Sequence, residues 1–433
     1  MSLNIPASFG PPILVERQDG EALRLDGAES THALHVQVAD AREFAGIGEQ
    51  WANLCTRAAV PNVFMDPAVA SAFAESWTDP VRVLLAWQGG GATSAPRLVG
   101  AWLLVERVTR LSWPWAALVS PSCRVAYLGT PVIDQAFAAP ALATMLETIR
   151  RTPGLPKLIE AGDFSVGSTM SGVLETVLAG GAGAARVIET RRRATLLSGP
   201  DPRTFWARSM SRQRLQGFAR KRRQLGKEGE LAFVSVEEPE AVVAALAEFL
   251  RLEASGWKGE RLSALASDPA TARFTVRMVA GLAQHRRVTI QSLRLDGAPV
   301  AMWVILYSGA AAYTWRTAFD EAFGRFSPGI LLLEDTTAHL LTRAGVAFTD
   351  SCNARDAGHQ AERWPDRHEV CDLLIDVSGT RSGRVQLLAR REMAIRACRR
   401  GARDLYHRLR RGLGGVAGRL RNLRATLATR RPL

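Results

Sequence analysis

Hydrophobic and polar positions recur along most of the chain with the spacing of ordinary helices and strands. The pattern becomes regular at about His35, whereas residues 1–30 combine proline, glycine and charge without a period and are expected to form a loose arm. Residues 64–77 predict a helix with Asp66 as N-cap and Pro67 in its first position. Further helices are predicted over residues 139–151, 204–230, 239–256, 270–285 and 327–345.

Alternating and continuous apolar runs predict the strands. Residues 81–87 and 97–108 flank a glycine-rich hairpin loop, and Asp296-Gly297, the pair most typical of a tight hairpin, separates two further apolar runs. The small residues at 179–185 predict a flexible connection. The remaining strands are predicted over residues 155–163, 287–295, 298–309, 311–320, 346–350 and 371–376.

The order helix, hairpin, strand, helix, strand occurs in residues 64–163 and again in residues 270–350. The similarity lies in the pattern of elements and not in matched residues. It favours two copies of one α/β fold, with coincidence among common elements as the alternative.

Composition agrees with a globular chain of two or three domains. The 433 residues are 47% hydrophobic, and no run reaches the roughly 18 apolar residues of a membrane-spanning helix. The N-terminal residues lack a basic flank followed by an apolar run, so we expect no signal peptide and a cytoplasmic location. Five cysteines fit a reducing compartment and exclude a disulfide scaffold.

The net charge of +13 belongs to the C-terminal tail. Residues 381–433 hold 16 arginines and two acidic residues, and residues 1–380 have a net charge of -1. Leucines recur in the tail at steps of three and four between arginines, which predicts a basic amphipathic helix. Such a helix could lie on an anionic membrane surface at the inner face of the membrane, or remain packed or disordered. RNA is a less favoured partner because few aromatic residues lie between the arginines.

The junction between a predicted strand and the helix at Ser327 is a candidate anion site. Free N–H groups and the dipole of a helix N-terminus attract phosphate, Gly329 permits close approach, and Arg325 could reach a phosphate oxygen. Ordinary helix capping is the alternative. Asp320 and Asp350 end successive predicted strands, so we expect both on one edge of a parallel pair, where α/β folds place ligands.

Several of these segments together resemble a known family, the CelD-like acetyltransferases associated with cellulose and exopolysaccharide biosynthesis, within the GNAT superfamily of N-acetyltransferases. The resemblance covers residues 200–370 well and residues 35–200 more loosely. It is carried by Leu252, Glu253, Gly256, Trp257, Lys258, Gly259, Trp315, Phe319, Asp320, Ser327, Pro328, Gly329, Asp350, Ser351, Trp364 and Arg367, with Ser211, Arg212, Arg220 and Arg223 before them.

The resemblance implies a tandem GNAT-like fold with two mixed-sheet copies and a basic helical tail. The expected parts are an arm at 1–30, a first copy at 31–200 without cofactor, an acetyltransferase copy at 201–380 and the tail at 381–433. The second copy would bind acetyl-CoA through Arg325, Phe326, Ser327, Pro328, Gly329 and Ile330. This loop departs from the family pattern because Pro328 and Ile330 stand where glycines are usual. Residues 129–134 occupy the corresponding place in the first copy and contain no basic residue.

Acyl transfer from a thioester to an amine or hydroxyl needs a proton acceptor and donors for the developing oxyanion. The candidate bases are Glu253, Asp320 and Asp350; a helix-surface charge and a turn carboxylate are the alternatives for the first two. Trp257, Lys258 and Trp315 are candidates for lining an acceptor site, or for core packing and a solvated charge. A basic stripe on helix 204–230 could face coenzyme A phosphates, or be a solvated face; it comprises Arg208, Arg212, Arg220, Arg223 and Lys227.

Other chemistries have less support in the sequence. Cys352, His359, His368 and Cys371 lack the paired spacing of a zinc site, so we predict no metal, and neither a phosphate-binding P-loop nor a G-x-S-x-G motif is present. The leading hypothesis is an acetyl-CoA-dependent acyltransferase acting on a small sugar-like or envelope-related acceptor. The alternatives are a Fem-like transferase that takes aminoacyl groups from transfer RNA, and a non-catalytic scaffold that docks at the membrane through the tail.

Overall fold

The fold was analysed in a computed structural model, which describes residues 34–40, 43–89, 95–121, 125–379, 382–399 and 401–402. The arm predicted at 1–30 and most of the C-terminal tail lie outside these residues. Within the described part, no helix is long and apolar enough to cross a membrane.

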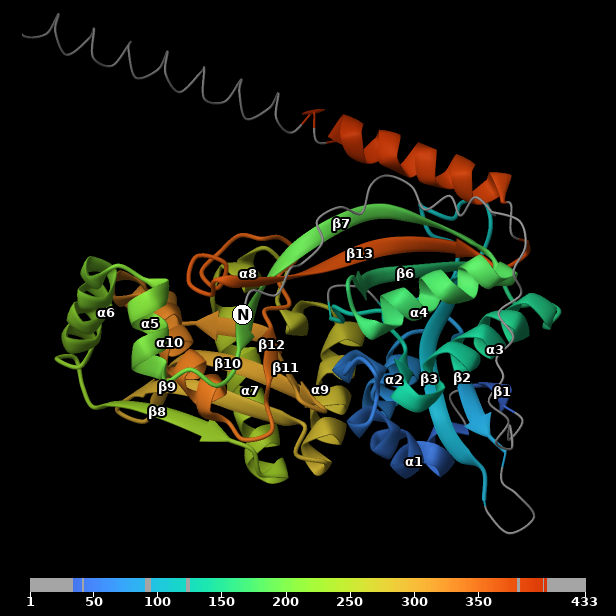
Figure 1. The fold of residues 1–433 in the computed structure, drawn as a ribbon. Coiled ribbons are helices and arrows are strands. Elements are labelled where there is room, and N and C mark those ends of the chain that lie inside the picture. The colour runs from blue at the N-terminus through green and yellow to red at the C-terminus, as the bar shows by residue number, and fades with distance from the viewer. Residues whose placement is uncertain are drawn as a thin grey trace, which may run out of the picture.

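The chain forms two halves of similar layout around one large mixed sheet (Figure 1). The first half contains strands β1 (Leu34–Ala39), β2 (Val81–Gln88), β3 (Arg97–Arg107), β4 (Ala117–Val119), β5 (Val132–Ile133), β6 (Leu158–Ser165) and β7 (Ala184–Leu197), and helices α1 (Phe44–Thr56), α2 (Pro67–Ser76), α3 (Ala138–Arg151) and α4 (Thr169–Val177). The second half contains helices α5 (Pro202–Ser209), α6 (Arg212–Leu225), α7 (Pro239–Ser255), α8 (Trp257–Glu260), α9 (Pro269–Gln284) and α10 (Pro328–Thr342), and strands β8 (Leu231–Val236), β9 (Val288–Leu295), β10 (Ala298–Ser308), β11 (Ala311–Phe319), β12 (Phe348–Asp350) and β13 (Asp366–Asp376).

Counted inward from its two edges, the sheet repeats one arrangement of antiparallel and parallel strands. Its order is β1-β2-β3-β4-β6-β13-β7-β12-β11-β10-β9-β8, with β5 paired to β3. Each half has an antiparallel run that ends in one parallel pair, β4 with β6 and β11 with β12, and a helix connects the two strands of each pair. The predicted duplication of one α/β unit is therefore confirmed.

The two halves exchange strands at the centre of the sheet. Strand β13 of the second half lies between β6 and β7 of the first, and β7 lies between β13 and β12. Because β13 pairs along its whole length with β7, the halves share one continuous ladder of hydrogen bonds.

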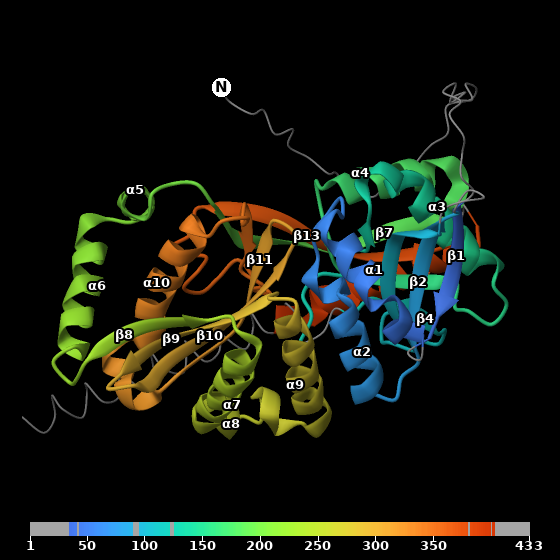
Figure 2. The same ribbon diagram turned by 90° about the horizontal axis from the view of Figure 1, so that it is seen from below.

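Helices cover the sheet in layers. In the second half α7 and α9 lie on one face, and α5, α6 and α10 lie on the other (Figure 2). Helices α2 and α9 pack against each other across the junction, where Phe73 and Trp77 contact Phe274. Residues 383–399 form a further helix, which packs Val385 and Leu388 on β4, β6, β7 and β13.

Local signals in the sequence placed many of these elements correctly. Asp66 caps α2, its side chain accepting a hydrogen bond from the Ala68 N–H, with Pro67 in the first position. Asp296 and Gly297 both have positive φ, as a tight two-residue hairpin between β9 and β10 requires.

Two predictions were wrong. The helix predicted over residues 204–230 is divided into α5 and α6, because Met210 is extended and Ser211 caps the second helix. Residues 179–185 are not simply a flexible connection: a helical turn continues to Ala182, and β7 begins at Ala184. Strand β7 itself was not predicted.

The structure also shows which residues of the first half correspond to which residues of the second, a correspondence that the sequence pattern did not give. The Asp134 N–H donates to the Val99 carbonyl on β3, and the Asp320 N–H donates to the Val300 carbonyl on β10. Helices α2 and α9 both begin with Asp-Pro-Ala, and residues 134–137 and 320–323 both read Asp-x-Ala-Phe.

Candidate functional site

The parallel pair of the second half opens after three residues. Residues 311–313 of β11 pair with residues 348–350 of β12, and β11 then continues to Phe319 without this neighbour. The chain turns away at Cys352, which has a φ of 54°. Beyond Tyr313 this edge of β11 is therefore not paired with β12.

The loop that follows β11 leads into helix α10 through a strained residue. Asp320 caps the short helix η6 (Glu321–Phe326) by accepting from the Ala322 N–H at 2.9 Å. Ser327 then adopts a left-handed conformation with a φ of 55°, and Pro328 begins α10. This conformation costs free energy, so the surrounding contacts must hold it.

Ser327 occupies the N-cap position of α10, but its side chain does not cap the helix. Its hydroxyl Oγ accepts a hydrogen bond from Nζ of Lys221 on α6 at 2.5 Å. A lysine therefore lies at the positive end of α10, where an anion would be stabilised. Lys221 was missed from the sequence because it lies outside the stripe that helical spacing selected.

The other residues predicted to bind the cofactor divide into two groups. Arg325 is 69% exposed, with its guanidinium 3.0 Å from Glu228 and stacked over the Phe326 ring. Phe326 and Pro328 are buried and support the loop from within. Gly329 and Ile330 are half-buried, and a Cβ on Gly329 would meet only the Phe319 ring at van der Waals distance.

Helix α6 adds positive charge beside this loop. Arg222 binds Glu334 at 3.2 Å and Asp335 at 2.8 Å on α10, which fixes the two helices side by side. Burial raises the pKa of Asp335 to about 6, although Arg222 opposes the shift. The predicted stripe of five cations on α5, α6 and the turn that follows is exposed to solvent.

Glu253 and Lys258 form a buried pair at the corner between α7 and α8. Lys258 Nζ donates to Glu253 Oε1 at 2.9 Å and to the Thr317 carbonyl of β11 at 2.7 Å. The second carboxylate oxygen of Glu253 accepts from the Leu265 N–H at 2.7 Å. Burial lowers the pKa of Lys258, with Glu253 opposing. The pair thus lies against the part of β11 that β12 leaves uncovered.

The two candidate tryptophans have different environments. Trp257 is 43% exposed, its backbone N–H donates to Glu321 Oε1, and the Arg261 guanidinium stacks on its ring. Trp315 is buried, and its indole Nε1 donates to the Val125 carbonyl of the first half at 2.8 Å. Trp257 can therefore contact a ligand, whereas Trp315 packs between the halves.

Asp350 does not share an edge with Asp320, which corrects the prediction. Asp350 pairs with Tyr313, seven residues before Asp320, and at about 3.3 Å per residue the two lie roughly 20 Å apart along β11. The error arose because the length of a parallel pairing is not a local property of the sequence.

Asp350 is instead the centre of a buried ion-pair network. Its Oδ2 lies 3.3 Å from Arg193 and 3.3 Å from His368, and Oδ1 accepts from the Cys352 N–H at 2.7 Å. Burial opposes ionisation, but His368, Arg193 and the Cys352 N–H hold the pKa of Asp350 well below its usual range. A carboxylate so stabilised is a poor proton acceptor.

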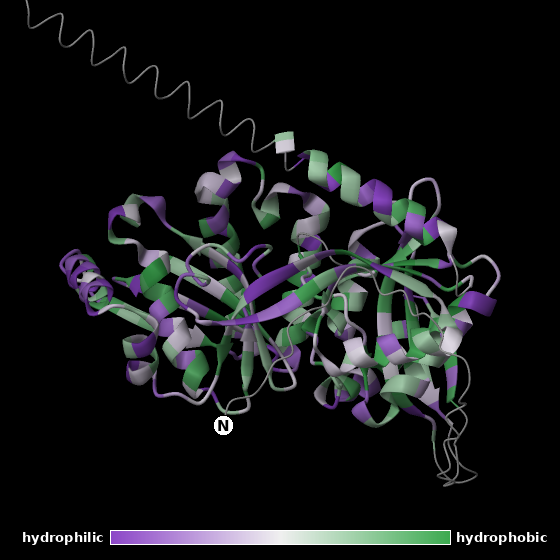
Figure 3. Cartoon of the chain, turned by 45° about the horizontal axis from the view of Figure 1, so that its top comes forward, coloured by the Kyte–Doolittle hydropathy of each residue, from purple (hydrophilic) through white to green (hydrophobic). Residues whose placement is uncertain are grey.

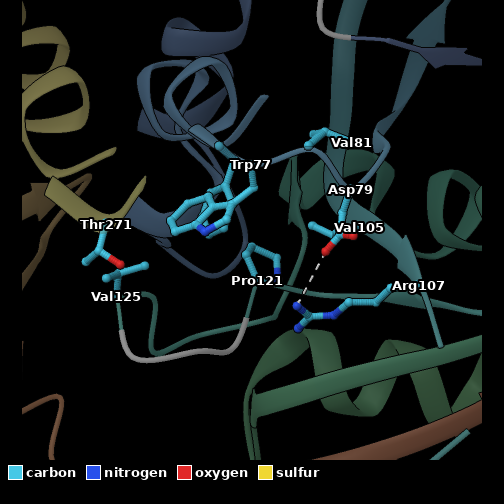
Figure 4. A pocket seen from close by; sticks show the side chains of 9 residues that line it. Trp77, Asp79, Val81, Val105, Arg107, Pro121, Val125 and Thr271 are labelled. Carbon is cyan, nitrogen blue, oxygen red and sulfur yellow. Dashed lines mark ion pairs between the residues drawn. The ribbon is translucent and has the colours of Figure 1, made fainter. Parts of the chain in front are cut away.

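A pocket of about 190 Å³ lies at the junction of the two halves (Figure 4). Trp77 from the end of α2 and Thr271 from the start of α9 face it, and Asp79 and Arg107 pair across its other side at 3.9 Å. Val125, whose carbonyl binds Trp315, is part of the wall. The lining is otherwise apolar.

The corresponding loop of the first half is closed by its own charges. Asp134 caps the short helix η3 (Gln135–Phe137) as Asp320 caps η6. Arg57 and Arg97 both bind Asp134 Oδ2 at 2.7 Å. A carboxylate of the chain thus takes the cations that an incoming anion would need.

Comparisons with known proteins bear on the family of the second half and on the fold. Residues 211–364 match the family model described as an acetyltransferase (GNAT) domain. The fold resembles the crystal structure of FemX, with 11% identity, a TM-score of 0.50, and coverage of 76% of this chain and 95% of that one. These findings support the GNAT superfamily for the second half, and the fold is a tandem GNAT-like α/β fold.

Other solved structures are similar at lower scores. The C-terminal domain of a putative lysylphosphatidylglycerol synthetase from Agrobacterium fabrum has 14% identity and a TM-score of 0.47, over 81% of this chain and 96% of that one. A tandem GNAT protein from the clavulanic acid biosynthesis pathway has 12% identity and a TM-score of 0.36, over 81% of this chain and all of that one. No curated protein matches the sequence. The CelD-like subfamily stays a prediction.

Proposed function

We propose that the protein transfers an acetyl group from acetyl-CoA to an amine or hydroxyl of a small sugar-like acceptor in envelope or exopolysaccharide synthesis. The acyltransferase class rests on the family match over residues 211–364. The observation that carries the choice of donor is the start of α10, where Lys221 and Arg325 flank a left-handed Ser327 within this matched region.

The start of α10 fits the phosphates of coenzyme A. Lys221 supplies a positive charge at the helix N-terminus, and the exposed Arg325 can turn from Glu228 towards a phosphate oxygen. Asp320 and the buried Phe326 and Pro328 hold the loop in place. The edge of β11 that β12 leaves unpaired extends from Thr314 past Thr317 to this loop.

The thioester of the donor supplies the acetyl group. The acceptor nitrogen or oxygen forms a bond to the carbonyl carbon, the carbon–sulfur bond breaks, and coenzyme A leaves as a thiolate. The chain must take one proton from the acceptor, and that proton then balances the charge of the leaving sulfur. The Glu253–Lys258 pair is placed for this task, since it lies on β11 at Thr317 between the point of opening and the α10 loop. Asp350 is not assigned this role because its ion pairs hold its pKa low, which makes its carboxylate a weak base.

The acceptor would reach β11 from the junction pocket. Trp77 offers an aromatic face, and Asp79 with Arg107 offers charged hydrogen-bonding groups beside it. A ring with an apolar face and polar substituents, as in a sugar, suits such a lining.

Calorimetric titration of acetyl-CoA into the full-length protein tests the donor. Arg325→Ala and Lys221→Ala should each weaken binding roughly tenfold, the loss of one charge-assisted hydrogen bond. Arg97→Ala, at the equivalent loop of the first half, is the matched control and should leave the affinity unchanged. Absence of binding by the folded wild type would reject acetyl-CoA as the donor, and titration of an aminoacyl-transfer RNA would then test the Fem-like alternative.

Glu253→Gln tests the proton acceptor. The substitution keeps the shape and the acceptor oxygen for Leu265 but removes the charge beside Lys258. We expect kcat to fall about 10²–10⁴-fold while the dissociation constant of acetyl-CoA stays the same. Unchanged turnover in a stopped assay of free thiol release would assign the proton to another group.

A further inference from the structure

Two tryptophans are exposed on the first half, far along the chain from the residues of the site. They belong to the Trp113 loop, defined as residues 108–115 between β3 and β4. Trp113 is 63% exposed and Trp115 is 39% exposed, and Val108 beside them is also exposed. Exposed aromatic groups of this size, gathered in one loop, mark an interaction surface.

The Trp113 loop is held in place by the helix at residues 383–399. The Arg391 guanidinium donates to the carbonyls of Trp113 at 2.6 Å, Arg110 at 2.7 Å and Leu111 at 2.9 Å. Leu111 packs with Val385 and Leu388 of the helix in one apolar cluster. The tryptophans are therefore presented by a fixed scaffold.

The helix places arginines directly beside the tryptophans. Arg384 lies 5.8 Å from the Trp115 ring, and Arg391 lies 6.0 Å from the Trp113 ring. Leu387, one turn from each arginine, is exposed as well. Polar and apolar residues alternate along this helix where it lies on the sheet (Figure 3).

The outward charge of this surface is positive. Residues 383–399 contain five arginines, of which Arg384 pairs with Asp376 and Arg396 with Glu189 and Asp372, whereas Arg390 and Arg399 are exposed. The single acid, Glu392, is fully buried and bound by Arg110 and Arg396. The sequence after the helix continues the sign, with nine arginines and one aspartate in residues 403–433. A second copy of the chain would meet this surface with like charge.

We infer that the Trp113 loop and the helix at 383–399 form a docking surface for an anionic lipid bilayer. Tryptophan is enriched at the boundary between the apolar and polar layers of a membrane, because its side chain has an apolar ring and a polar N–H. Trp113, Trp115, Val108 and Leu387 together supply the apolar area. The exposed Arg390 and Arg399 of the same helix would attract lipid phosphates, an attraction that acts within about one Debye length of the membrane. This inference does not depend on the proposed reaction.

Vesicle sedimentation with the full-length protein tests the inference. Vesicles of phosphatidylglycerol with phosphatidylcholine should bind the protein, and vesicles of phosphatidylcholine alone should bind it much more weakly. The double substitution Trp113→Ala, Trp115→Ala should weaken binding roughly tenfold. Arg390→Glu with Arg399→Glu should weaken binding most at low salt and should make the remaining binding less sensitive to salt than that of the wild type. Trp257→Ala, an exposed tryptophan on the other half, is the matched control and should bind as the wild type does.

Lipids brominated in the acyl chain report the position of the rings. They should quench tryptophan fluorescence in the wild type more than in the double variant, whose circular dichroism should be unchanged because both side chains are exposed. Equal vesicle binding by wild type and double variant would overturn the inference. It would also be overturned if the tryptophan substitutions abolished binding to single-stranded RNA, or dissociated a dimer, while leaving vesicle binding intact.

Discussion

The two halves share a framework but differ in what fills the corner where the parallel strands separate. Asp134 and Asp320 hold the same place, each with its N–H on a valine carbonyl of the neighbouring strand and each capping a short helix. In the first half two arginines close on Asp134. In the second half a lysine and an arginine surround Ser327. A duplicated fold can thus keep its scaffold in both copies while the charges at this corner differ between them.

A second pair of equivalent positions differs in electrostatics. Glu160 ends the parallel pairing of β4 with β6, as Asp350 ends that of β11 with β12. Burial raises the pKa of Glu160, with the hydroxyls of Thr109 and Ser112 opposing, whereas ion pairs and hydrogen bonds outweigh burial at Asp350 and lower its pKa. The surroundings of Asp350 therefore stabilise its ionised form, whereas the surroundings of Glu160 destabilise its ionised form.

The largest predicted effect is at Asp350. Asp350→Asn leaves Arg193 buried with one charge partner fewer, so the free energy of unfolding at neutral pH should fall by about 3–5 kcal/mol. Because the folded pKa is lowered, this contribution is present above the ordinary value of 3.8 and is lost as pH falls through the folded pKa. Urea unfolding across acid and neutral pH measures it, and a variant as stable as wild type at neutral pH would show that the network is not stabilising.

The capping aspartates come next and separate structure from function. Asp320→Ala should cost about 0.5–2 kcal/mol of stability through the lost cap, and Asp134→Ala should cost more because it also removes the carboxylate that Arg57 and Arg97 share. Only Asp320→Ala should weaken acetyl-CoA binding, by about fivefold, because it loosens the loop that carries Arg325. Equal effects of the two substitutions in calorimetric titration would mean that the halves do not differ in donor binding.

The smallest effect is expected at Glu160. A raised folded pKa means that the folded state loses stability as pH rises from the ordinary value of 4.5 through the folded value. Glu160→Gln removes this loss, so the variant should match wild type below that value and exceed it at neutral pH by less than about 1 kcal/mol. A variant less stable than wild type at neutral pH would indicate that the ionised carboxylate is stabilised by its surroundings.

Sequence reasoning succeeded where structure is decided by neighbours in the chain. The cap at Asp66 and the hairpin at Asp296 each depend on a few adjacent residues. Strand β7 was missed because three consecutive arginines resemble a solvated segment. Two of these, the half-buried Arg191 and the buried Arg193, instead pair with acidic residues from β6, β12 and β13, which no local pattern contains.

The candidate site follows the same rule. Glu253, Lys258 and Trp257 are close in sequence and also meet in space, beside β11. Lys221 reaches Ser327 from a helix more than a hundred residues earlier, and no spacing rule joins them. The tryptophans at 113 and 115 lie in a short loop whose exposure depends on the distant helix at 383–399.

The exchange of strands has a consequence for how the chain is made. Strand β7 ends at Leu197, but the strand that separates it from β6 begins only at Asp366. At about 5–20 residues per second, a ribosome needs on the order of ten seconds or more to produce the missing strand. During that time β6 and β7 have unpaired edges that are open to wrong partners. The first half therefore cannot finish folding when its own residues have emerged, and it depends on the last strand of the second half for its completion.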